Sequence, residues 1–159
     1  MPHRIIEKPE DLDAFTTLLG TLKLPFTVEW VQGRDRTGEQ NRLQFLWARE
    51  AAEQKGDRTP EEQRNEWKLR FGVPIMREDS PEFRKVYDTL IKDRLSYEEK
   101  IEAMELIAVT SLMKVRQMVR YLDAIDRECA QEGVKLTQPD ADLAAYHSRY
   151  RDKPQARAA

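Results

Sequence analysis

Helix-start signals recur along most of this chain. Thr37, Thr59 and Ser96 each stand three residues before a Gln or Glu, the arrangement in which two side chains cap the first backbone N–H groups of a helix. Ser80-Pro81 and Pro139 are further start signals, because proline fits the first turn of a helix. Such a series predicts a fold built mainly from helices.

Apolar residues at helical spacing follow these signals. Two helices are expected over residues 37–52 and 59–72, the second ending at Gly72 before Pro74. The longest is expected over residues 113–131, with Gly133 as its stop. The clearest apolar stripes are Phe83, Val86, Tyr87, Leu90 and Ile91 after Ser80, and Val115, Met118, Val119, Leu122, Ile125 and Cys129 in the longest helix.

The N-terminal stretch has a different pattern. Arg4–Ile6 and Phe26–Val31 read as strands, the second because apolar and polar side chains alternate along it, and a helical stripe lies between Pro9 and Gly20. Two strands joined by a helix usually pair in parallel. We therefore expect an α+β fold, mostly helical, with a short N-terminal β-α-β unit and a small sheet followed by several amphipathic helices. Leu106–Val109 fits either a helix end or a third strand.

Composition sets the class of protein. Of 159 residues, 35% are charged and 40% apolar, which allows a packed core and argues against disorder of the whole chain. One domain is expected over residues 1–152, with a polar, disordered tail at 153–159. Cys129 is the only cysteine, so disulfides are excluded and a reducing compartment is indicated. With no apolar run of the ~20 residues that a membrane span needs, we expect a cytoplasmic protein.

No catalytic site, cofactor or metal is expected. Cys129 lies on an apolar helix stripe without a base beside it in sequence. His3 and His147 are far apart, and with one cysteine they make no zinc-binding spacing. The acidic residues are mostly interleaved with Lys and Arg, which is typical of solvated helix faces.

Basic residues are unevenly distributed on a chain whose formal net charge is −2. No acid occurs in 106–122, and local basic clusters on a mildly acidic chain indicate a confined site for an anion. Solvated helix surface is the alternative. The clusters are Arg34, Arg36 and Arg42; Lys114, Arg116 and Arg120; and Arg149, Arg151, Lys153 and Arg157 near the C-terminus.

Two motifs occur in order along the chain. The first, Arg36-Thr-Gly-Glu-Gln40-Asn41-Arg42, precedes an aromatic-rich helix, and the second, Thr110–Val115, precedes the longest helix and Glu132–Lys135. Together they resemble the NinB (Orf) family of phage recombination mediators, in which Arg, then Ser or Thr, two variable residues and Gln-Asn precede a helix bearing a Trp. The expected β-α-β arrangement fits the family too, and the resemblance covers about residues 5–135.

The resemblance implies a homodimer that binds single-stranded DNA, helps to load a recombinase, and engages or displaces the host single-strand-binding protein. A phage-encoded protein of this kind acts in the bacterial cytoplasm. The family pattern has its Trp five residues after the Gln, where this chain has Phe45, and Trp47 lies two residues further on.

Phe45 and Trp47 cannot share one helix face. Trp47 is expected in the core, and Phe45 is the candidate platform for a stacked base. Gln40 fits a capping role but also marks a helix start suited to a phosphate, whereas Asn41 has no capping role. The candidate DNA-binding residues are Arg34, Arg36, Gln40, Asn41, Arg42, Phe45, Lys114, Arg116 and Arg120.

Three functions remain open from the sequence. The first is a single-stranded-DNA-binding accessory protein of phage homologous recombination. The second is a helical protein-interaction adaptor whose basic clusters are merely solvated. The third is a divergent metal-dependent nuclease, which predicts strand cleavage in Mg²⁺ or Mn²⁺.

Overall fold

The computed structural model describes residues 4, 6, 8–30 and 38–151, and the chain divides into two compact units, Met1–Gly33 and Arg34–Ala159. We refer to these as the N-terminal unit and the C-terminal unit. The expected tail, residues 153–159, lies outside the described residues, and the expectation of a single domain stays a prediction. No helix formed by the described part of the chain is long and apolar enough to cross a membrane.

The N-terminal unit contains helix α1, Pro9–Thr21, close to the expected range. Its start is stabilised by the carboxylate of Asp11, which accepts a hydrogen bond from the backbone N–H of Lys8 at 3.0 Å, and by Pro9 in the first turn. None of the residues in α1 is buried.

The expected β-α-β unit and small sheet are wrong for the described residues, none of which belongs to a sheet. Residues 26–30 lack secondary structure and are exposed, as are Arg4 and Ile6; Ile5 and Val31 lie outside the described residues. Alternation of apolar and polar side chains stabilises a strand only when another strand pairs with it and one face is buried. Here the alternating side chains have no buried side within the described residues, so the fold class is helical.

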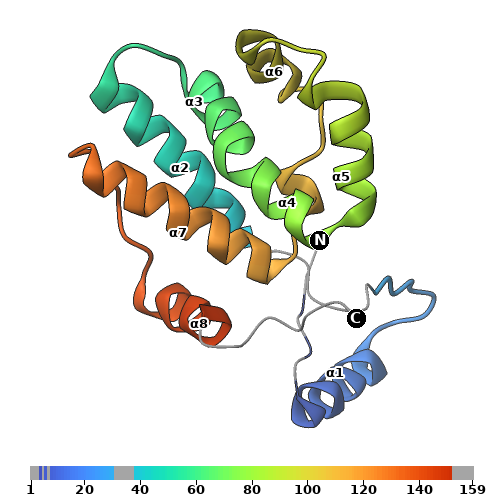
Figure 1. The fold of residues 1–159 in the computed structure, drawn as a ribbon. Helices are drawn as coiled ribbons and strands as arrows, with labels where there is room; N and C mark the ends of the chain where they lie inside the picture. The colour runs from blue at the N-terminus through green and yellow to red at the C-terminus, as the bar shows by residue number, and fades with distance from the viewer. Residues whose placement is uncertain (1–3, 5, 7, 31–37, 152–159) are drawn as a thin grey trace. The chain divides into compact units, whose positions relative to one another are not determined.

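The C-terminal unit is built from helices (Figure 1). Its α-helices are α2 (Gly38–Lys55), α3 (Pro60–Trp67), α4 (Val73–Asp79), α5 (Pro81–Tyr87), α6 (Tyr97–Ala103), α7 (Val115–Gln131) and α8 (Ala141–Arg151). Two π-helical turns, η1 (Lys68–Gly72) and η2 (Asp88–Lys92), continue α3 and α5, and a 3-10 turn, η3 (Thr110–Leu112), precedes α7. Leu106–Val109 forms neither a helix nor a strand.

Three of the predicted helix starts are confirmed by their hydrogen bonds. The hydroxyls of Thr59 and Ser96 each accept from the N–H three residues on at 3.2 Å, and Glu62 and Glu99 return the bond to the cap N–H at 2.8 and 2.7 Å. Ser80 caps α5 in the same way, although no acid returns the bond to its N–H. Thr37 lies outside the described residues. Capping depends on neighbours within one turn, which explains why sequence identifies it well.

The predicted helix end at Gly72 is wrong, because α3, η1 and α4 form one continuous helix. The N–H of Val73 bonds to the carbonyl of Lys68, five residues back, and this wide turn accommodates Pro74, which has no N–H to donate. Gly72 has a packing role instead. A Cβ atom placed there would lie 2.8 Å from Cγ1 of Val109, so only glycine permits this close approach.

The core lies between α2, the continuous α3–α4 helix and α7, which run side by side in Figure 1. Trp47, Ala48 and Ala51 of α2 pack there, and the indole N–H of Trp47 donates to the carbonyl of Thr137 at 2.6 Å. The core position predicted for Trp47 is therefore confirmed. The predicted apolar stripe of α7 is also buried along its whole length, and Gly133 (φ +75°) follows its end as predicted.

The stripe predicted for α5 is only partly correct. Tyr87 and Ile91 are buried and Phe83 is half-buried, but Val86 and Leu90 are 56% and 57% exposed. Leu90 lies in the π-helical turn η2, which changes the angular spacing of successive side chains, so regular helical periodicity does not describe its position.

Candidate functional site

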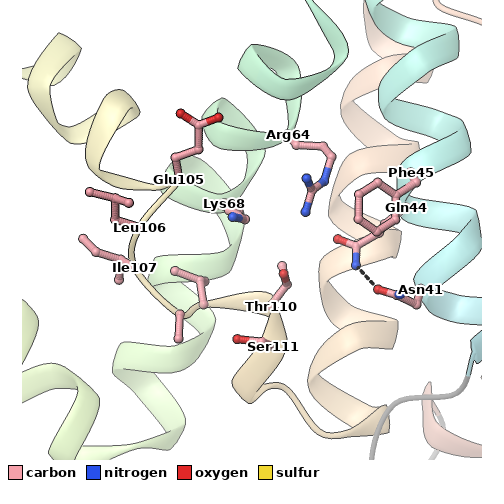
Figure 2. Close-up of a pocket in the computed structure, with 12 residues that line it drawn as sticks. Asn41, Gln44, Phe45, Arg64, Lys68, Glu105, Leu106, Ile107, Thr110 and Ser111 are labelled. Carbon is pink, nitrogen blue, oxygen red and sulfur yellow. Dashed lines mark hydrogen bonds between the residues drawn. The ribbon is translucent and has the colours of Figure 1, made fainter.

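An open cavity of about 350 Å³ lies between α2, the α3–η1 helix and the loop that leads from α6 into η3 (Figure 2). We call it the α2–α3 cavity. It is lined by Asn41, Gln44 and Phe45 of α2, by Arg64 and Lys68 of the α3–η1 helix, and by residues 105–111 of the loop and η3.

The two motifs recognised in the sequence meet at this cavity. Asn41 belongs to the first motif, and Thr110 and Ser111 open the second, yet all three line the same cavity. One contact joins the two motifs directly, because Nε2 of Gln40 in the first lies 3.4 Å from the carbonyl oxygen of Val115 in the second. Segments about seventy residues apart in sequence therefore form one surface only in the folded protein.

Phe45 and Arg64 form the most distinctive feature of the cavity. The guanidinium carbon of Arg64 lies 4.0 Å from the centre of the Phe45 ring, a cation–π arrangement, and the Phe45 residue remains 46% exposed. Phe45 is exposed because α2 turns its neighbours Leu43, Gln44 and Trp47 towards the core. The Nε atom of Arg64 is buried without a hydrogen-bond partner among the described residues.

Asn41 and Gln44 form an amide pair beside this ring. Nε2 of Gln44 donates to Oδ1 of Asn41 at 2.8 Å, as the dashed line in Figure 2 shows. Gln44 is 2% exposed, so its polar group is held on the cavity wall rather than in bulk solvent. On the opposite side, Nζ of Lys68 donates to the carbonyl of Met104 at 2.9 Å and anchors the start of the loop.

Gln40 lies in the interior rather than at the cavity. Besides its contact with α7, its Nε2 atom lies 3.2 Å from Nε2 of His147 on α8, and the residue has no exposed surface. Burial lowers the pKa of His147, and the positive charge of Arg151 lowers it further, which favours the neutral imidazole. Gln40 therefore links α2, α7 and α8 and positions the neighbouring cavity residues.

The predicted basic residues have different surroundings. Arg42 and Lys114 are exposed and Arg116 is half-buried. Arg120 bonds to Glu78 at 2.6 Å and to Asp79 at 3.2 Å, so two acids of α4 offset its charge. Arg34 and Arg36 lie outside the described residues.

Sequence reasoning missed Arg64 and Lys68. Both occur in a segment of mixed charge between Arg58 and Arg70, where neither spacing nor composition distinguishes them. Only the packing of α3 against α2 brings Arg64 over Phe45, and no local signal in the sequence predicts that contact.

Within the described residues, no group of three or more His, Cys, Asp or Glu side chains is arranged to hold a metal ion. Cys129 is buried, and this burial raises the pKa of its thiol to about 11, which keeps it protonated at neutral pH.

No family model, curated protein or solved structure matches this chain. Functional inference therefore rests on the geometry of the α2–α3 cavity and on the two motifs that meet there. Of the predicted site residues, Asn41 and Phe45 line the cavity, while Gln40 lies behind it.

Proposed function

We propose that this protein binds single-stranded DNA through the α2–α3 cavity, as an accessory protein of phage homologous recombination that assists the loading of a recombinase. The observation that carries the DNA-binding part is the half-exposed Phe45 ring beneath the Arg64 guanidinium, in a cavity where both motifs meet. Unpaired bases stack on aromatic rings and on guanidinium planes, and this site offers both.

Stacking accounts for binding without sequence preference. Every base has an aromatic face, and stacking on a protein ring contributes about 1–3 kcal/mol per base. Duplex DNA keeps its bases paired and stacked, so it cannot offer a face to Phe45 without being opened. The site geometry therefore favours single strands.

We assign contacts with DNA phosphates to basic residues that follow cavity-lining residues along the chain. Arg42 follows Asn41 on α2, and Lys114 and Arg116 follow the second motif at the start of α7. These side chains can attract the backbone without a global positive charge, which the chain lacks. Arg120 is a weaker candidate for a phosphate contact, because its charge is already offset by ion pairs with Glu78 and Asp79.

The role in recombination rests on the NinB (Orf) resemblance carried by the two motifs. That resemblance also supports a homodimer, contacts with a host single-strand-binding protein and a recombinase, and a location in the bacterial cytoplasm. Its β-α-β part has no counterpart in the described residues, so the support comes from the motifs alone.

A direct test titrates a fluorescent single strand and the matching duplex at several salt concentrations. We expect the single strand to bind more tightly, with affinity falling as salt rises because bound phosphates release counterions. Arg64→Gln should weaken binding, whereas Arg94→Gln, a change at an exposed arginine that does not line the cavity, should not. No binding at low salt, or equal effects of the two variants, would reject the proposal.

A protein-interaction adaptor is the second candidate, favoured by the exposed apolar side chains of Val86, Leu90 and Leu106. It predicts no salt-dependent binding to either oligonucleotide. Repeating the titration with Mg²⁺ or Mn²⁺ and running the products on a denaturing gel tests the nuclease alternative, which predicts shortened strands.

A further inference from the structure

We propose that the α2–α3 cavity holds one unpaired nucleobase at a time, stacked against Phe45, and that the Asn41–Gln44 amide pair hydrogen-bonds to the edge of that base. This inference rests on the proposed function and adds a ligand to it: a single nucleotide of a flexible strand, recognised by its face and its edge together.

The cavity is limited to one base by the elements that bound it. Its volume of about 350 Å³ is near the lower end of the roughly 300–1,000 Å³ found for small-molecule sites. A run of stacked bases needs a long groove, whereas this cavity is bounded by α2 on one side and by the loop at residues 105–111 on the other (Figure 2). The neighbouring nucleotides of the strand therefore lie outside it.

The amide pair has the chemistry that a base edge requires. The internal hydrogen bond uses one N–H of Gln44 and one lone pair of Asn41, and leaves the Asn41 NH₂ as a donor and the Gln44 carbonyl as an acceptor. If both amides are turned over, Asn41 supplies the acceptor and Gln44 the donors. In either assignment the pair presents one donor and one acceptor. Every nucleobase likewise has a donor beside an acceptor on its Watson–Crick edge, so the two can form complementary hydrogen bonds.

The Asn41–Gln44 amide pair is largely shielded from bulk solvent, which raises the cost of leaving its polar groups without hydrogen bonds. Gln44 is 2% exposed and Asn41 is half-buried, yet their hydrogen bond satisfies only part of their capacity. Polar groups on a sheltered wall that lack protein partners bind water or a ligand, and a base that fills the cavity without replacing those bonds loses affinity. The pair therefore penalises any group that stacks but cannot hydrogen-bond.

Arg64 sets the position of the stacked base. Its guanidinium already lies over Phe45, and no ion pair with a carboxylate occurs for it among the described residues. A base enters against the exposed part of the Phe45 ring, beside the guanidinium and with the amide pair at its edge. Thr110 and Ser111 line the cavity as well.

The test compares a six-nucleotide oligothymidylate with the same strand carrying difluorotoluene, an apolar shape-match of thymine, in place of every base. Both strands have the same charge and both can stack, but the second has no effective hydrogen bonds. We expect the full chain to bind the natural strand about tenfold more tightly, equivalent to about 1.4 kcal/mol. Equal binding would overturn the inference and leave the proposed function standing. If neither strand binds, the proposed function fails and the inference with it.

Two variants test whether the preference for the natural strand comes from the Asn41–Gln44 amide pair. Asn41→Leu keeps the branching of the side chain and removes the amide, so the preference for the natural strand should fall to about twofold or less. Arg42→Gln, at the neighbouring exposed position, should weaken both strands by the same factor and keep the preference, because it removes only a phosphate contact. A preference that survives Asn41→Leu unchanged, in a variant that melts normally, would show that the amide pair does not read the base. The comparison on the unaltered protein needs no variant and stands if Asn41→Leu does not fold.

Discussion

At the scale of single residues, two aromatic side chains on α2 have opposite roles although they are two positions apart. Trp47 is buried and donates its indole N–H to Thr137, whereas Phe45 faces the cavity. Their separation of two residues places them on different sides of the helix, as the sequence predicted. The contrast gives each residue a separate experimental signature.

Trp47→Ala should reduce the free energy of unfolding by roughly 3–5 kcal/mol, because it leaves a large cavity in the core. Phe45→Ala should change stability little, but it should weaken single-stranded-DNA binding by the loss of about 1–3 kcal/mol of stacking, without altering the salt dependence. Urea melts and oligonucleotide titrations separate these effects. An unstable Phe45→Ala and a stable, non-binding Trp47→Ala would reverse the assignment.

Two arginines predicted to bind DNA should also differ. Charge reversal of Arg42 is expected to weaken DNA binding and flatten its salt dependence, with little loss of stability at an exposed position. Arg120→Glu should instead destabilise the fold by roughly 1 kcal/mol or more, because it places three acids together at Glu78 and Asp79. Thermal melts beside titrations measure both quantities. Equal loss of DNA binding in the two variants would contradict this ranking.

At the scale of elements, the close packing of the continuous α3–α4 helix against Val109 depends on one glycine. Gly72→Ala should destabilise the protein by about 1–3 kcal/mol, because the added Cβ would lie 2.8 Å from Val109 and overpack the contact. Gly20→Ala in α1 is the matched control, since nothing lies within 4 Å of its Cβ position and alanine favours a helix. Chemical denaturation measures both, and a Gly72→Ala variant as stable as the unaltered protein would exclude the packing role.

Helix α8 is attached through a buried imidazole, which predicts a pH dependence. His147 contacts Gln40, and burial lowers its pKa in the folded state. Because the unfolded chain then binds a proton more readily, the stability contributed by neutral His147 is fully present above the unfolded pKa of about 6.5 and is lost as pH falls through the lower folded pKa. Urea melts between pH 7.5 and 5 should show this decline, and His147→Gln should reduce it. A decline of equal slope in both proteins would assign the effect elsewhere.

A nearby arginine provides a second test of the pH dependence assigned to His147. Arg151 donates to Asp123 at 2.8 Å, an ion pair between α8 and α7, and it lowers the pKa of His147 while Asp123 raises it. Arg151→Gln should therefore raise the imidazole pKa towards its unfolded value and make the decline in stability smaller. Nuclear magnetic resonance titration of the imidazole measures the shift directly.

At the scale of the whole molecule, the homodimer stays a prediction, and two exposed apolar residues offer a surface for it. Trp67 and Tyr87 are buried within the chain, whereas Val86 and Leu90 are more than half exposed. Closed two-fold dimers commonly cover such surfaces. Sedimentation should give about twice the 18.7 kDa mass of one chain at micromolar concentration, and replacing Val86 and Leu90 by lysine should yield monomers. A strictly monomeric unaltered protein would contradict the prediction.

The sequence by itself determined where several helices begin and which faces they bury. Thr59, Ser80 and Ser96 cap helices because the interacting groups lie within one turn, and the spacing along α7 identifies its core face. The same reasoning assigned Trp47 to the core and Phe45 to an exposed face. These features depend on short-range hydrogen bonds and on helical periodicity, both of which can be read from consecutive residues.

Tertiary structure decided everything that needs a distant partner. The alternating residues of 26–30 form no sheet because no described strand pairs with them, and the α3–α4 helix passes Pro74 with Gly72 packed closely against Val109. The cavity likewise exists only because α2, the α3–η1 helix and the loop at residues 105–111 come together in the folded chain. A side chain's neighbours across helices are set by packing of the whole core, and no local pattern encodes them.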